Sequence, residues 1–128
     1  MTEDKGRELI YKELSFKVVG ALFEVYNNLG FGYPEKIYQR AVAEELKKNG
    51  LSFERESFSR VHYKGKVVGA YFQDFIIESK LVLELKVGSS IYENHVNQVL
   101  AYLKDTELRL GLIALFSRKG VLFKRIVN

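Results

Sequence analysis

The sequence has 128 residues, a net charge of +4 and no cysteine. This length predicts a single domain over residues 1–128 with enough chain for a hydrophobic core, and the lack of cysteine excludes disulfides and thiolate metal sites. The N-terminus, MTED, lacks the basic and then apolar pattern of a secretory signal, and no apolar run is long enough to span a bilayer. We therefore expect a soluble, cytoplasmic protein with no membrane association.

Two amphipathic helices are predicted in the first 50 residues. Apolar residues recur at three- and four-residue steps from Leu14 to Leu29, and Gly30 can end that helix in a left-handed conformation. Pro34 suits the first turn of a second helix because its missing N–H costs nothing there. This second helix runs to Asn49 and Gly50.

Strands follow the two helices. Residues 51–63, 67–77 and 81–87 predict a three-stranded antiparallel meander, with turns at residues 64–65 and 78–80. Helical spacing returns over residues 90–104. Residues 108–116 form a continuous apolar run, typical of a strand buried on both faces, and residues 121–127 predict a last strand. The predicted order is α-α-β-β-β-α-β-β.

Three ionisable residues lie inside otherwise apolar strands. Glu84 and Lys86 are two residues apart, so in a strand they point to the same face. The three-residue connection 78–80 pairs residue 77 with residue 81, which places Asp74 opposite Glu84. We expect both carboxylates and the ammonium to converge on one side of the hairpin, although a slip of one residue would send Asp74 to the other face.

The group of Asp74, Glu84 and Lys86 can be interpreted as a metal site or as an ordinary ion pair. Paired carboxylates can hold Mg²⁺ or Mn²⁺ beside a phosphate, and the lysine can orient a water or neutralise charge in the transition state. Yet Glu-x-Lys on a strand is commonly only a solvated ion pair. The apolar residues that flank Glu84 favour the functional interpretation, since a charge in a buried strand needs a partner.

With these residues in place, the sequence resembles a known family. Asp74, nine residues, and then Glu84-Leu85-Lys86 match the D-x(n)-E-x-K signature of the PD-(D/E)XK nuclease-like superfamily. Residues 32–38, GYPEKIY, match the motif that names its GxxExxY protein family. Similar segments occur at residues 29–32, 45–51 and 110–112. The resemblance covers residues 10–128. In place of the Asn-Phe-Gly-like segment of that family, this chain has Leu115-Phe116-Ser117-Arg118.

The resemblance implies an α/β (α+β) fold, with a restriction-endonuclease-like αβββαβ core whose mixed sheet is flanked by helices. It also implies that Glu35 joins Asp74 and Glu84 around the metal, with Glu24 as an alternative. A glutamate at a helix N-terminus is, however, also favoured by the helix dipole. Gln98 and Tyr102 resemble the Q-x-x-x-Y element of related nucleases. A tyrosine packed at a helix–sheet contact, with Gln98 beside it, explains them equally well, and His95 reads as an ordinary, partly exposed histidine.

The basic excess suggests a nucleic-acid partner, most of all near the C-terminus. Arg118, Lys119, Lys124 and Arg125 are the candidate phosphate-facing residues, although a solvated basic face is the commoner meaning of such a cluster. Tyr63, Lys64 and Lys66 could touch a substrate, but a hairpin turn explains them as well.

Three functional hypotheses follow. The first is a nuclease that depends on Mg²⁺ or Mn²⁺ and acts on DNA, with RNA as the less favoured alternative. The second is a non-catalytic nucleic-acid-binding or assembly module on the same fold, and the third is a small basic subunit of a larger complex. The intact set of Asp74, Glu84 and Lys86 favours the first. Nucleases of this fold often pair, so we expect a homodimer.

Overall fold

The computed structural model describes residues 10–128, so the acidic start of the chain, residues 1–4, lies outside the described residues. Over the described range the order of helices and strands is the predicted one. Gly30 ends the first helix with a φ of 70°, and its N–H bonds to the carbonyl of Tyr26.

None of the helices between residues 10 and 128 has both the length and the apolar character needed to cross a membrane. The helices are α2 (Lys12–Leu29), α3 (Glu35–Lys48) and α4 (Glu93–Thr106); the strands are β1 (Phe53–Tyr63), β2 (Lys66–Ile77), β3 (Leu81–Val87), β4 (Leu110–Ser117) and β5 (Gly120–Val127).

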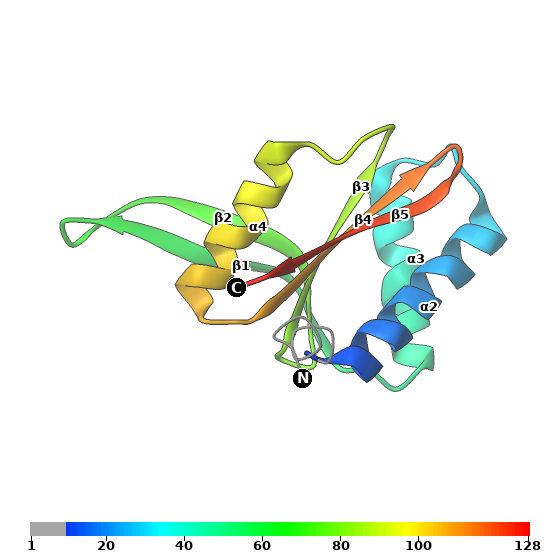
Figure 1. Ribbon diagram of the computed structural model, residues 1–128, viewed down its shortest axis with the longest axis horizontal. Coiled ribbons are helices and arrows are strands. Elements are labelled where there is room, and N and C mark those ends of the chain that lie inside the picture. Colours follow the sequence, from blue (N-terminus) through cyan, green and yellow to red (C-terminus); the bar gives the residue numbers. More distant parts are fainter. Residues whose placement is uncertain (1–9) are drawn as a thin grey trace, which may run out of the picture.

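The five strands form one mixed sheet in the order β1-β2-β3-β4-β5. Strands β3 and β4 are parallel and are joined through α4, while the other neighbouring pairs are antiparallel. Figure 1 shows α2 and α3 together at one end of the sheet and α4 apart from them. The α/β fold class and the antiparallel meander are therefore confirmed.

The core has two parts, one on each face of the sheet. Leu81, Leu83 and Leu85 of β3 pack with α2 and α3, whereas Val82 packs with α4. This alternation is the side-chain period of a strand covered on both faces. It places Glu84 and Lys86 on the α4 side of β3.

Strand β2 belongs to the sheet along only part of its length. Its pairing with β3 covers Phe75, Ile76 and Ile77 alone, whereas its pairing with β1 extends to Lys66. Residues 57–72 therefore form a two-stranded arm, which we call the β1–β2 arm. In Figure 1 the arm projects past α4, away from α2 and α3.

A close approach between α4 and β4 leads to the first testable prediction. A Cβ atom added at Gly111 would lie 2.6 Å from Cγ1 of Val99 and 3.4 Å from Cδ1 of Leu103. Both side chains are buried, and the β-branched Val99 has little rotamer freedom. Gly111→Ala should therefore lower the free energy of unfolding by about 1 to 3 kcal/mol through overpacking.

Urea unfolding monitored by circular dichroism measures this difference. Gly20 of α2 is the control, because a Cβ atom there meets nothing within 4 Å. Gly20→Ala should stabilise the protein by roughly 0.5 to 1 kcal/mol through helix propensity. Equal effects of the two substitutions would contradict the α4–β4 packing.

Candidate active site

Asp74 lies at the point where β2 and β3 separate. The pair Ile77–Leu81 confirms the predicted register, and the ladder ends at Phe75–Leu83. Beyond it, two hydrogen bonds from backbone N–H groups to carboxylates take the place of the ladder. The Asp74 N–H donates to Oε1 of Glu84 at 3.0 Å, and Oδ2 of Asp74 accepts from the Leu85 N–H at 2.8 Å. Each carboxylate thus accepts a hydrogen bond from the backbone of the strand that carries the other one.

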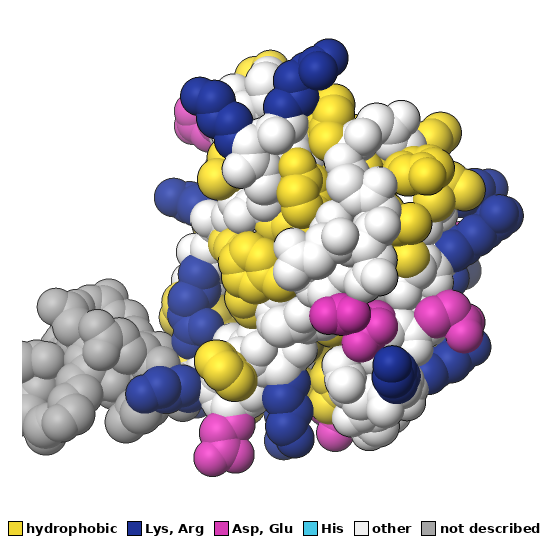
Figure 2. Space-filling model, turned by 90° about the vertical axis from the view of Figure 1, so that its right-hand side faces the viewer, with side chains coloured by type: hydrophobic (Ala, Val, Ile, Leu, Met, Phe, Trp, Pro, Cys, Tyr) yellow, Lys and Arg dark blue, Asp and Glu magenta, His cyan; other side chains and the backbone are white. Residues whose placement is uncertain are grey.

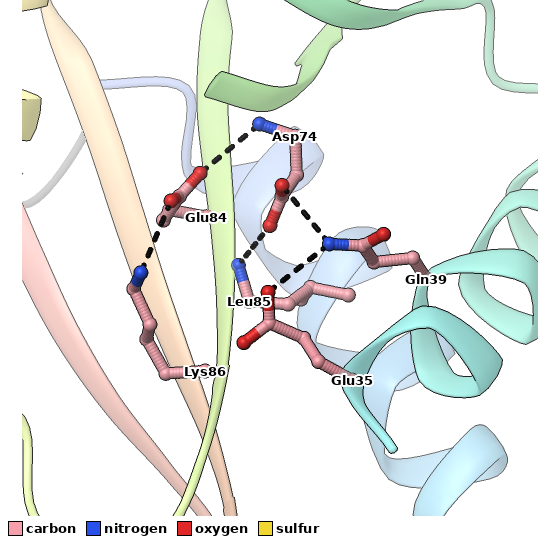
Figure 3. Close-up of polar contacts among 6 residues, drawn as sticks. All are labelled: Glu35, Gln39, Asp74, Glu84, Leu85 and Lys86. Carbon is pink, nitrogen blue, oxygen red and sulfur yellow. Dashed lines mark hydrogen bonds and ion pairs between the residues drawn. The ribbon is translucent and has the colours of Figure 1, made fainter. Parts of the chain in front are cut away.

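The side chain of Asp74 reaches toward the α3 layer. A regular strand would place it with Ile76, which packs in the α4 cluster. Instead, Oδ1 of Asp74 accepts a hydrogen bond from Nε2 of Gln39 on α3, at 3.1 Å. The adjoining strand is irregular here, because Glu56, opposite Asp74, has a φ of 54°. Such local irregularities re-aim side chains next to active sites. In Figure 3, Glu84 and Lys86 lie on one side of β3, and Asp74, Gln39 and Glu35 on the other. The prediction that Asp74, Glu84 and Lys86 converge on one side of the hairpin is therefore wrong for Asp74, whose carboxylate turns toward Gln39.

Gln39 connects Asp74 to Glu35. Its Nε2 also donates to Oε2 of Glu35 at 3.2 Å, one helical turn away. Sequence reasoning missed Gln39, although its spacing of four residues from Glu35 places both side chains on one helix face. Glu24, the alternative acid, takes no part here, since its Oε2 accepts a hydrogen bond from Asn28 on α2.

Burial raises the pKa of all three acids, and repulsion from Asp74 adds to the rise for Glu35 and Glu84. Burial raises the pKa of Glu84 to about 7, repulsion from Asp74 adds to this, and attraction to Lys86 opposes it. Burial also raises the pKa of Asp74, against the hydrogen bond from Leu85 and the charge of Lys86. The pKa of Glu35 is raised by burial and then by Asp74. Raised carboxyl pKa values grouped in one place are typical of functional sites.

Lys86 is the cation of the group. Its Nζ lies 3.5 Å from Oε2 of Glu84, and its side chain is 24% exposed. The same ammonium lowers the pKa values of Glu35, Asp74 and Glu84. The single positive charge of Lys86 cannot balance the charges of Glu35, Asp74 and Glu84 when all three are ionised, so a second cation would stabilise the group.

The residues fit a divalent metal with few protein ligands. Within residues 10–128, no three Asp, Glu, His or Cys side chains are gathered as a ready ligand set, and the Gln39 amide bonds to both Glu35 and Asp74. Mg²⁺, however, usually keeps several waters and takes only one or two carboxylates from the protein. The adjacent pair Asp74 and Glu84 meets that requirement.

Among the described residues, Gln98 and Tyr102 of α4 make no direct bond to the candidate site. Tyr102 is 4% exposed and packs in the α4 cluster; burial and then Glu54 raise the pKa of its hydroxyl. Over the described chain, no hydrogen bond or ion pair joins Gln98 or Tyr102 to Asp74, Glu84 or Lys86. His95, also on α4, lies close enough to Lys86 for that charge, after burial, to lower the pKa of its imidazole.

The four basic residues near the C-terminus do not form one surface. The Arg118 guanidinium lies 5.3 Å from the ring centre of Phe31, in the loop before α3, and Lys119 is beside it in the β4–β5 turn. Arg125 instead donates hydrogen bonds to Oγ of Ser15 and to the carbonyl of Ile10, near the start of α2. Lys124 is its neighbour in β5 and points to the opposite face. Figure 2 likewise shows Lys and Arg side chains scattered around this side of the molecule, with no single patch.

Comparisons with known proteins agree on the fold. The family model of the PD-(D/E)XK nuclease superfamily matches residues 12–126. A crystal structure of the protein SSO0001 is similar, with a TM-score of 0.57 and 23% identity over 94% of this chain and 59% of that one. So is an alkaline exonuclease, LHK-Exo, from Laribacter hongkongensis, with a TM-score of 0.53 and 10% identity over 73% of this chain and 55% of that one. This chain thus spans less than two thirds of either protein. A search of curated protein sequences found no match.

Proposed function

Because the chain belongs to the PD-(D/E)XK nuclease superfamily, we propose that it is a metal-dependent nuclease that hydrolyses phosphodiester bonds, in DNA rather than RNA. The observation that carries the proposal is the buried pair Asp74–Glu84 with Lys86 beside it. These acids have raised pKa values and one cation among them, so they suit a bound Mg²⁺ or Mn²⁺. The motif GYPEKIY at residues 32–38 supports placing the chain in the GxxExxY group.

Each residue has a distinct role in this proposal. Asp74 and Glu84 would hold the cation, which supplies Lewis-acid chemistry at the phosphoryl group. Glu35 would be the third acid of the site. It accepts a hydrogen bond from the Gln39 amide, which also bonds to the Asp74 carboxylate and orients it. Lys86 would orient or deprotonate the attacking water, or neutralise the charge that develops on the phosphate oxygens.

The second candidate is a nucleic-acid-binding module that does not cut. The hydrogen bonds of Gln39 favour it, since they occupy oxygens of both Glu35 and Asp74.

A homodimer and a single domain over residues 1–128 remain predictions. Sedimentation velocity would test the first, and limited proteolysis would test the second.

The deciding experiment is a cleavage assay with one labelled duplex and one labelled single strand. We expect products with Mg²⁺ or Mn²⁺ and none with EDTA. Asp74→Asn should abolish cleavage, because it removes a ligand charge and leaves the rest of the site in place. Binding of both strands without cleavage in any divalent metal would replace the nuclease with the binding module.

Metal binding can be tested without a substrate. Repulsion between Asp74 and Glu84 is relieved by a cation, so Mn²⁺ at about 100 times its Kd should raise the melting temperature by roughly 5 to 10 °C. Asp74→Asn should remove most of this rise. Glu24→Gln is the matched control and should keep it, because Glu24 is exposed and bonds to Asn28 on its own helix. Equal rises in both variants would argue against a metal at Asp74.

A further inference from the structure

We propose that the β1–β2 arm, residues 57–72, binds an unpaired segment of a nucleic-acid strand and leads it to Asp74. This inference rests on the proposed function for the meaning of the site at Asp74. The binding itself depends on the arm alone and can be tested without cleavage.

The arm exposes large hydrophobic side chains that no part of the described chain covers. Tyr63 is 61% exposed, Val68 63% and Phe72 59%, and Phe58 and Val67 are nearly as open. A hairpin of two strands is only marginally stable in water, and exposed apolar side chains gathered on one element often mark a binding site. The arm thus has the composition of an element with a partner.

The positive charge of the arm favours an anionic partner. Residues 57–72 include Arg60, Lys64 and Lys66 but neither Asp nor Glu. The cations also stand close to the rings. The Arg60 guanidinium lies 4.9 Å from the centre of the Phe58 ring, and Nζ of Lys64 lies 5.4 Å from that of Tyr63. Rings interleaved with cations can contact bases and phosphates at once, as in proteins that bind single strands.

Two of the rings lie close to the candidate active site. Phe58 and Phe72 are cross-strand partners with ring centres 5.5 Å apart. Phe72 precedes Asp74 by two residues in β2, with roughly 7 Å between their Cα atoms, and the Asp74 side chain reaches toward α3 rather than α4. Tyr71 packs against the α4 cluster, which directs Phe72 away from α4. A base stacked on Phe72 would therefore hold its strand next to Asp74.

An unpaired strand fits this surface better than a duplex or a second copy of the chain. Bases in a duplex stack on one another, so their faces are not available to Phe58 and Phe72. In a contact between two arms, the cations Arg60, Lys64 and Lys66 of each would meet like charges with no acid in either arm. An unpaired strand offers free base faces and phosphates together.

The test is equilibrium binding of a labelled 20-nucleotide single strand and of the matching duplex, in EDTA so that no cleavage occurs. Phe58→Ala/Phe72→Ala should weaken single-strand binding at least about fivefold and duplex binding much less. Phe16→Ala is the matched control, because Phe16 is 80% exposed on α2, far from the arm in the chain. It should leave the affinity unchanged, and melting temperatures check that all variants fold.

A spectroscopic signal tests the stacking directly. The sequence has no tryptophan, so Phe72→Trp introduces a single indole at the arm. Its fluorescence should be quenched by the single strand but not by an abasic strand of the same length, which offers phosphates without bases. The indole of Phe16→Trp should be quenched by neither.

Each outcome separates the arm from the nuclease. Quenching by the single strand together with weaker binding by the double variant supports the arm, whether or not the protein cuts. Unchanged affinity in the double variant overturns the arm, even if Mg²⁺-dependent cleavage is intact and the proposed function holds. Sedimentation that shows a wild-type dimer and a monomeric double variant, with no change in binding, would assign the arm to a second copy of the chain and overturn the inference.

Discussion

Lys86→Met is expected to slow cleavage by about 10²- to 10⁴-fold, the usual range for removing a group that moves or orients a proton. Lys86 holds its ammonium 3.5 Å from Glu84, where it can act on charge that develops only in the transition state. Such an interaction contributes to the rate and little to ground-state binding. The Kd for a labelled duplex in Ca²⁺ should therefore change by less than about threefold.

Single-turnover cleavage and equilibrium binding, measured on the same substrate, separate the two effects. Lys80→Met is the control, since Lys80 is an exposed lysine in the β2–β3 turn whose ammonium lies over Tyr11. It should cut at the wild-type rate. Equal rates for Lys86→Met and Lys80→Met would mean that the catalytic site lies elsewhere.

Glu84→Gln is expected to stabilise the metal-free protein at pH 8.5, by about 3 kcal/mol, and far less at pH 5. In the folded protein burial and Asp74 raise the pKa of Glu84 to about 7, from an ordinary value of 4.5. Between these values the folded state holds a proton that the unfolded state has released. Stability therefore falls as pH rises above the unfolded pKa, and the loss is complete above the folded one. Glutamine carries no charge to bury and can still accept the bond from the Asp74 N–H.

Urea unfolding in EDTA at the two pH values measures this effect. Glu78 provides a control of opposite sign, because hydrogen bonds from the hydroxyl and the backbone N–H of Ser52 lower its pKa. Its contribution to stability is present above its unfolded pKa and is lost in acid, so Glu78→Gln should destabilise the protein at neutral pH. A Glu84→Gln effect that is the same at pH 5 and pH 8.5 would contradict the raised pKa.

The sequence by itself determined the order of elements and the register of the hairpin. Helical and strand periods depend on neighbouring residues, so the changes of period at residues 50 and 90 are readable without a structure. The three-residue connection between Ile77 and Leu81 set which residues face each other, because pairing propagates from the turn. The proximity of Asp74 to Glu84 follows from that local rule.

Only the tertiary structure decided which helical residues reach those two acids. The roll of a helix on a sheet depends on the packing of both surfaces, which no local pattern encodes. Thus α3 brings Gln39 to Asp74, and α4 places His95 where the charge of Lys86 lowers its pKa, while Tyr102 is buried in the α4 cluster. Arg125 shows the same limit. The basic excess near the C-terminus made it a candidate for phosphate binding, and its contacts with the start of α2 emerge only in the folded chain.

The β1–β2 arm could also be recognised only in the tertiary structure. The strand pattern of residues 51–77 predicts a hairpin, but it does not reveal where β3 stops pairing with β2. That point is set at Phe75, where the acids Asp74 and Glu84 replace the backbone ladder with side-chain hydrogen bonds. The backbone N–H groups of Asp74 and Leu85 bond to carboxylates there, so the candidate site lies where the arm separates from β3.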